Sequence, residues 1–445
     1  MNIQLSDHFT YKRLIRFTLP SIAMMVFTSI YGVVDGLFVS NFVGETSFAA
    51  INFIMPFLMI LGSFGFMFGT GGSALIAKTL GEGKREKAHR LFSMLTFISF
   101  ATGAAIAVLG ILFLEPIGAM LGAEGEMLDE CVIYGRIILI ALPAMMLQQE
   151  FQSFFVVAEK PQLGLFTTIA SGITNMVLDA LFIAIFGWGV AGAAAATAIS
   201  QAVGGFVPVF YFLSKNTSLL RLTKPAFDGK ALLKTCTNGS SEFLSNAAMS
   251  LVGLLYNVQL MHYAGKPGVA AYGVMMYVGW IFVSIYVGYS VGTAPLVGYN
   301  YGADNRRELK NLLTKSIAVT ACLSAVMTVL GIVMAYPLSY IFMSKSPETL
   351  AMTVHGFKIF SFQFLFCGLA IFGSGFFTAL NNGLISAVIS FLRTLVFQLG
   401  AILLLPLIWS PPVDGIWASV VFAEAIATLL SFIFLLANKK KYGYL

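Results

Sequence analysis

The chain alternates between long apolar stretches and short polar ones along its whole length. Each apolar stretch holds about 20 or more residues, the length that an α-helix needs to cross the hydrocarbon core of a bilayer. We therefore predict an all-α integral membrane protein with twelve transmembrane helices. The predicted helices span residues 16–40, 48–76, 91–114, 131–157, 163–186, 190–213, 239–263, 269–298, 312–341, 351–379, 385–408 and 414–437.

The amino-acid composition supports this class. Hydrophobic residues make up 58% of the chain, charged residues only 10%, and the mean hydropathy is +0.86. A soluble domain has about 25% charged residues. The four cysteines form no CxxC pair and the four histidines are isolated. We therefore expect no disulfide framework, no Cys/His metal centre and no enzyme active site.

The net charge of +6 comes from basic residues that lie mainly between the predicted helices and at the ends of the chain. Lys and Arg gather before the first predicted helix, after the second, sixth and eighth, and at the C-terminal end, while the segment after the third helix is acidic. Basic loops tend to stay on the cytoplasmic side of a membrane. The pattern predicts that both ends of the chain are cytoplasmic, and it explains the excess of positive charge without a nucleic-acid partner.

The two halves of the sequence resemble each other. LGEGKREKAHRLF (80–92) and YGADNRRELKNLL (301–313) each follow a pair of predicted helices, with a Gly turn and a basic start to the next helix. Each half holds six helices, an even number, so both enter the membrane in the same direction. We predict two pseudo-symmetric six-helix bundles: an N-terminal lobe (1–214), a cytoplasmic linker (215–238) and a C-terminal lobe (239–445).

Four polar side chains fall at a similar depth in the first half. Counted at about 1.5 Å per residue from the cytoplasmic ends, Asp35 lies roughly 28 Å along the first helix and Asp179 roughly 24 Å along the fifth. Asn175 lies one turn before Asp179 on the same helix face, and Thr197 lies about 10 Å from the outer end of the sixth helix. A charge in the bilayer centre costs at least about 2.5–3.5 kcal/mol, so such residues usually mark an ion or substrate path.

The residues alone leave three interpretations of this cluster open. Carboxylate, amide and hydroxyl oxygens coordinate a hard cation such as Na⁺. Two neighbouring acids equally suit a proton carrier, because each disfavours ionisation of the other. The third interpretation is structural, with protonated acids that only hydrogen-bond across helices. At the repeat offset Asp35 falls on Tyr256 and Asp179 near Ala401, and this asymmetry favours a coupling site in the N-terminal half alone.

Three further acids lie in the predicted spans. Glu150 belongs to the glutamine-rich stretch 148–152 and is expected to polarise a wall of a central cavity. Glu242 begins the seventh helix, where a carboxylate suits the helix N-terminus, and Arg393 is a candidate partner for it. Glu424 has no evident partner in the sequence.

Pro20 interrupts the first helix, which also carries Asp35. Proline removes a backbone hydrogen bond, so we expect a conformational hinge there. The chain contains 20 Met and 41 Phe, and such soft or aromatic side chains suit flat apolar cations. The predicted lining of the substrate cavity is Met24, Phe27, Met55, Gln149, Phe154, Tyr256 and Met276.

Together these features resemble the MATE (multidrug and toxic compound extrusion) transporters, in the bacterial MepA-like and DinF-like branch. The resemblance covers nearly the whole chain and rests on the two six-helix halves, the loop LGEGKREKA, its echo YGADNRRE and the first-helix segment SIYGVVDGLFVS. It implies a monomeric multi-pass protein of the bacterial inner membrane that exports organic cations or drugs in exchange for H⁺ or Na⁺, with no other cofactor. It also implies that Asp35, Asn175, Asp179 and Thr197 hold the coupling cation and that Pro20 is the hinge.

The nearest alternative is a flippase of the same superfamily for lipids or lipid-linked oligosaccharides. Such a protein needs a cationic cavity that holds a pyrophosphate group, yet Arg393 is almost the only basic residue buried in the predicted spans. A channel would carry a ring of repeated filter residues, which the sequence lacks. We therefore expect a cation exporter, and competition by an ethidium-type dye would separate it from a flippase.

Overall fold

The computed structural model describes residues 3–344 and 346–444, and its regular elements are helices throughout this part of the chain. Within these described residues, eleven helical segments are long and apolar enough to cross a membrane. The elements are α1 (Tyr11–Phe42), α2 (Glu45–Gly81), α3 (Arg85–Leu121), α4 (Gly125–Val157), α5 (Pro161–Asp179), η1 (Ala180–Ile185), α6 (Gly189–Leu213), α7 (Gly229–Gly302), α8 (Arg306–Met343), α9 (Pro347–Phe360), η2 (Ser361–Gln363), α10 (Phe364–Ala379), α11 (Gly383–Phe391), η3 (Leu392–Phe397), α12 (Gln398–Ile408) and α13 (Pro412–Tyr442).

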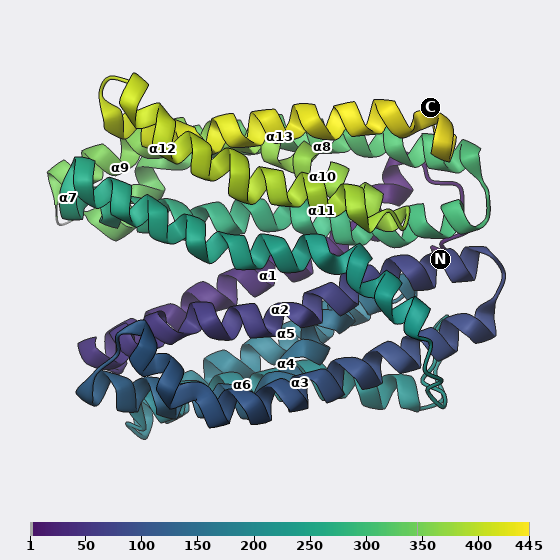
Figure 1. Ribbon diagram of the computed structural model, residues 1–445, viewed down its shortest axis with the longest axis horizontal. Helices are drawn as coiled ribbons and strands as arrows, with labels where there is room; N and C mark the ends of the chain where they lie inside the picture. Colours follow the sequence, from purple (N-terminus) through teal and green to yellow (C-terminus); the bar gives the residue numbers. More distant parts are fainter. Residues whose placement is uncertain (1–2, 345, 445) are drawn as a thin grey trace.

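The α7 helix accounts for two crossings. It is 74 residues long, and one crossing takes about 20 residues. Gly265 interrupts it with a φ of 61° and a ψ of −158°, a positive-φ conformation that glycine adopts without a steric penalty. The chain runs to one end of the molecule, turns there and returns (Figure 1). With α7 counted twice, the eleven segments provide the twelve predicted crossings.

The connection between α6 and α7 is shorter than predicted. It covers residues 214–228, and α7 begins at Gly229 rather than at residue 239. The Asp228 carboxylate accepts a hydrogen bond from the Ala231 amide at 3.1 Å. A carboxylate at this position satisfies a free N–H group and favours the start of a helix, a local signal that hydropathy alone does not register.

The helices form two bundles that lie side by side (Figure 1). We call α1–α6 the N-lobe and α7–α13 the C-lobe. Both ends of the chain lie at the same end of the molecule (Figure 1), which we call the terminal end, and the opposite end is the far end. The lobes meet mainly where α1 and α2 pack against α7.

At the terminal end the lobes approach each other backbone to backbone. A Cβ atom at Gly302 of α7 would collide with the carbonyl oxygen of Lys78 in α2, so the close approach requires glycine. Asn381, between α10 and α11, donates a hydrogen bond to the carbonyl oxygen of Ala74 in α2 at 3.1 Å. These contacts close the molecule at this end.

At the far end the lobes stand apart. About 650 Å³ of space, including the part open to solvent, separates α1 and α2 from α7 and α8. Gly36 of α1 and Gly273 of α7 both line this space, and a Cβ at either would meet no described atom of a neighbouring element within 4 Å. The structure is therefore closed at the terminal end and open at the far end.

Gly302→Ala is expected to weaken the closure of the terminal end. The added methyl group must displace the α2 backbone, and forced overpacking of this kind costs about 1–3 kcal/mol. Spin labels at the exposed positions 84 and 307, one on each lobe, should report a longer distance in the variant. Gly273→Ala, on the same helix but beside open space, is the control and should leave the distance unchanged. Equal distances in both variants would contradict this account of the contact.

The α1 helix runs without interruption from Tyr11 to Phe42, through the buried Pro20. The proline therefore does not end the helix. A role for Pro20 as a hinge in another conformation stays a prediction.

Candidate functional site

The four predicted coupling residues come from α1, α5 and α6 and meet inside the N-lobe. Asp35 lies within interaction range of Asp179 and Asn175, and the Asn175 amide donates a hydrogen bond to the Thr197 hydroxyl at 3.5 Å. The Asn175 and Asp179 side chains are buried. The structure thus brings together the residues that their depth and helix face had grouped.

Several oxygen atoms of this cluster lack a partner. Both carboxylate oxygens of Asp179, Oδ1 of Asp35 and the amide oxygen of Asn175 are buried with no hydrogen-bond partner among the described residues. Leaving one buried polar atom unpaired costs about 1–3 kcal/mol, and more for a charged group. Two ionised carboxylates side by side also repel each other. A proton or a hard cation bound here would both pair with the oxygen atoms and reduce the repulsion between the carboxylates. A set of oxygen ligands suits either one.

The local backbone helps to assemble the cluster. Gly172 of α5 faces the rings of Phe27 and Tyr31, and a Cβ there would collide with Phe27, so this glycine lets α1 and α5 approach closely. The α5 helix then ends at Asp179, and the π-helical turn η1 follows. π-Helical turns are rare in proteins, and those that occur are often found at functional sites.

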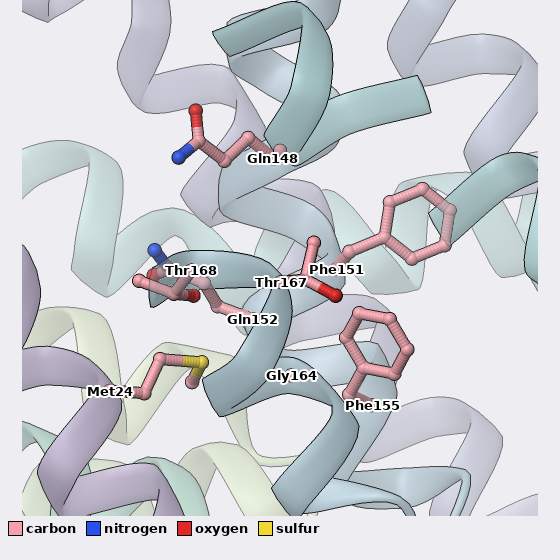
Figure 2. Close-up of a pocket in the computed structure, with 9 residues that line it drawn as sticks. Met24, Gln148, Phe151, Gln152, Phe155, Gly164, Thr167 and Thr168 are labelled. Carbon is pink, nitrogen blue, oxygen red and sulfur yellow. The ribbon is translucent and has the colours of Figure 1, made fainter. Parts of the chain in front are cut away.

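A small cavity lies in the N-lobe between the cluster and the terminal end. Figure 2 shows the rings of Phe151 and Phe155 on one side of it and Met24 and Thr168 on the other. Its free volume is about 10 Å³, close to the minimum for one water molecule. The cavity is therefore too small for an organic substrate.

The large cavity lies between the two lobes. It encloses about 1230 Å³, including the part open to solvent. Met25 and Phe66 of the N-lobe and Met249 of the C-lobe give it apolar walls, and Glu242 and Arg393 are its ionisable lining residues. A second cavity of about 720 Å³ in the C-lobe shares Met249 and Arg393 with it. Together they offer the volume and the soft walls that an organic ligand requires.

A family model described as MatE matches residues 20–181 and 243–402. The chain belongs to the MatE family. Among its relatives, the multidrug export protein MepA of Staphylococcus haemolyticus is 28% identical over 374 residues, covering 84% of this chain and 82% of that one. MepA of Staphylococcus aureus is 27% identical over 328 residues, covering 72% of each chain.

Solved structures of MatE proteins share the fold at about 20% identity. An outward-facing multidrug resistance MATE family transporter, 21% identical, superposes with a TM-score of 0.92 over 100% of this chain and 99% of that one. A MATE crystal structure in the straight conformation gives 0.92, and one in the bent conformation gives 0.87, each at 20% identity with 98% of both chains covered. The multi-pass, twelve-crossing architecture is therefore that of the family.

Two of the predicted substrate-cavity residues line the C-lobe cavity of this MatE protein, namely Tyr256 and Met276. Met24 lines the small N-lobe cavity instead. Phe154 is fully buried in an aromatic core, with its ring 5.2 Å from that of Phe92. For Met24 and Phe154 the structure corrects the prediction, because both side chains face neighbouring helices of their own lobe.

The other predicted lining residues also point into the N-lobe. Phe27 packs against α5 as described above. The Met55 sulfur accepts a hydrogen bond from the Tyr134 hydroxyl at 3.7 Å. Gln149 lies against glycines of α2. Glu150 is fully buried, and its two carboxylate oxygens have no hydrogen-bond partner among the described residues, so it does not form a cavity wall as predicted. The depth of a residue along a helix does not show how the helix is rotated about its axis. That rotation decides whether a side chain contacts the cavity or a neighbouring helix.

Arg393 pairs with Glu424 and not, as the sequence suggested, with Glu242. Its Nε donates to both carboxylate oxygens of Glu424, at 2.9 and 2.8 Å. This ion pair joins η3 to α13 within the C-lobe. Glu424, which had no evident partner in the sequence, therefore has one in the fold.

A segment at the beginning of the chain was missed by the sequence analysis. Residues 3–10, which we call the strap, cross the terminal end before α1 begins. Leu5 and Phe9 of the strap are fully buried. Two apolar residues four positions apart in the polar stretch NIQLSDHFTYKR were the only signal of this burial in the sequence.

The strap binds both lobes. On the N-lobe, the Leu5 amide donates to the Glu159 carboxylate at 2.7 Å, and burial raises the pKa of that carboxyl above its ordinary value. On the C-lobe, the Phe9 amide donates to one Glu308 oxygen at 2.9 Å, and His8 contacts the other at 2.7 Å. The strap therefore ties the two lobes together where they are closed.

Proposed function

We propose that this MatE protein is a secondary active exporter of small organic cations, multidrug in range like the MepA relatives, and not an enzyme. It exchanges these substrates for inward-moving H⁺ or Na⁺. The observation that carries the proposal is the cluster of buried, unpaired oxygen atoms on Asp35, Asn175 and Asp179. Acidic side chains with unpaired oxygens inside one lobe, together with a large cavity between two lobes, are the parts of a cation-coupled transporter.

The coupling ion is held by Asp35, Asn175, Asp179 and Thr197. Four oxygen-bearing side chains in one site suit Na⁺, and two neighbouring carboxyls suit a proton. The ion is the only cofactor that the proposal needs. The described residues include no cluster of three His, Cys, Asp or Glu side chains that would hold a transition metal.

Binding of the ion acts on the substrate cavity through α1. This helix carries Asp35 at the coupling site and Met25 at the cavity wall, with Pro20 nearby. Neutralising the acids removes their repulsion and allows α1 to repack, which lowers the affinity of the cavity for the substrate. By linkage, the bound substrate must weaken ion binding by the same factor.

The proposed orientation follows the basic loops. Both ends of the chain are cytoplasmic in a bacterial inner membrane, which makes the conformation described outward-facing, and the protein acts as a monomer among membrane lipids. An outward-open cavity can release a substrate outside and admit the coupling ion from the same side.

The test is dye exchange by purified protein in liposomes under an imposed gradient of H⁺ or of Na⁺. We expect ethidium to move against one of these gradients and to stop moving when that gradient is collapsed. Movement that ignores both gradients would contradict coupled antiport. Failure of ethidium to bind or move, together with movement of a lipid-linked substrate, would favour the flippase.

A further inference from the structure

The Arg393–Glu424 ion pair of the C-lobe lies beside two cavities. Arg393 lines both the cavity between the lobes and the cavity within the C-lobe. It is carried by the π-helical turn η3 (Leu392–Phe397), so the fifth crossing of each lobe has a π-helical turn beside a charged side chain. In the N-lobe that side chain is Asp179, at the end of α5. Such turns are enriched at functional sites.

The Arg393–Glu424 pair leaves most of the guanidinium unused. The Arg393 side chain is 15% exposed and that of Glu424 is 7% exposed. Only Nε donates to Glu424, and the described residues offer no hydrogen bond to the two terminal amino groups. Arg–carboxylate pairs are frequently bidentate, with two parallel N–H groups that each donate to one carboxylate oxygen. Here the remaining N–H donors belong to a side chain that lines the cavities.

The cavity between the lobes is also lined by an acidic side chain. The Glu242 side chain lines it and lies close enough to Arg393 to interact electrostatically, yet no hydrogen bond joins it to another described side chain. The two lining charges are therefore of opposite sign, an acid at Glu242 and spare N–H donors at Arg393. A ligand that carries both signs matches this arrangement better than a ligand with a positive charge alone.

We propose that Arg393 recognises the carboxylate of zwitterionic substrates, whose cationic part faces Glu242. The inference rests on the proposed function, since it assigns part of the export cavity to one substrate class. The guanidinium amino groups donate two hydrogen bonds to the substrate carboxylate, while Glu424 keeps Nε and fixes the plane of the group. Arg393 is thus a specificity-determining residue, and Glu424 positions it.

The experiment compares two dyes that differ at one group. Rhodamine 110 carries a free carboxylate and a delocalised cation, and rhodamine 123 is its methyl ester, with the cation alone. Binding of each dye to the purified protein is measured by fluorescence anisotropy. The variant is Arg393→Gln combined with Glu424→Gln, which removes both charges together so that neither is left buried without a partner.

We expect the dissociation constant of rhodamine 110 to rise about tenfold in the double variant, the size expected for loss of a charged hydrogen bond. That of rhodamine 123 should change less than about twofold, since the ester has no carboxylate to pair with Arg393 and its cation keeps the contact with Glu242. Glu424→Gln alone, which keeps the guanidinium, should retain the preference for the acid. A melting curve of each variant in detergent verifies that it is folded.

Equal loss of both dyes in the double variant would overturn the proposal, because a purely structural ion pair affects both alike. Failure of the wild-type protein to bind rhodamine 110 would also overturn it. Discrimination in binding without any export of either dye would instead contradict the proposed function, so the two failures are distinguishable.

Discussion

Asp179→Asn is expected to abolish gradient-driven export while leaving the protein folded in the membrane. Asparagine has nearly the shape of aspartate, but it neither releases a proton nor carries the charge that holds Na⁺. The coupling free energy between two ligands is typically about 1–3 kcal/mol, a 5- to 150-fold effect. We therefore expect ethidium movement under the driving gradient to fall at least about tenfold, measured with purified protein in liposomes.

Asp35→Asn should have the same effect, because Asp35 and Asp179 interact within one cluster. Glu150→Gln is the matched control. Glu150 is a fully buried acid of the same lobe with unpaired oxygens, but it lies outside the cluster, and gradient-driven movement should survive its replacement. Full activity of both Asp variants would contradict the coupling site. Equal loss in Glu150→Gln would show that any buried acid of the lobe is needed.

The sequence predicted the membrane fold because crossing a bilayer imposes a length and a composition that hydropathy registers directly. It did not register the start of α7, which depends on the carboxylate cap of Asp228. It also did not indicate that the two crossings of α7 follow each other through a single residue, Gly265, with a positive φ.

The grouping of Asp35, Asn175 and Asp179 was predictable because two quantities sufficed, the depth in the membrane and the spacing along the helix. Depth placed Asp35 and Asp179 at one level, and the spacing of four placed Asn175 on the same face as Asp179. The Arg393–Glu424 pair and the aromatic packing of Phe154 depend in addition on how each helix is rotated against its neighbours. Pseudo-symmetry gives no help at such positions, since the two lobes carry different residues there.

Glu308→Gln is expected to release the strap and open the terminal end. Glu308 is 5% exposed. Its carboxylate receives hydrogen bonds from the Phe9 backbone amide at 2.9 Å and the Asn311 side-chain amide at 2.7 Å, and His8 contacts it at 2.7 Å. Glutamine has one acceptor oxygen in place of two. Its NH₂ group would replace the second oxygen and face the N–H donors that the carboxylate now binds. A lost hydrogen bond to a charged group costs about 1.5–3 kcal/mol, which shifts the balance of closed and open forms roughly ten- to a hundredfold.

The measurement is the distance between spin labels at two exposed positions, 84 directly before α3 and 307 in the first turn of α8. Longer distances are expected in Glu308→Gln. Glu86→Gln is the control, because Glu86 is an exposed acid in the first turn of α3, as Glu308 is a buried acid in the first turn of α8. A strap that only shields apolar surface, without tying the lobes, would leave the distances of both variants equal to those of the wild type. Opening in Glu308→Gln alone would make the strap one of the contacts that each transport cycle has to break.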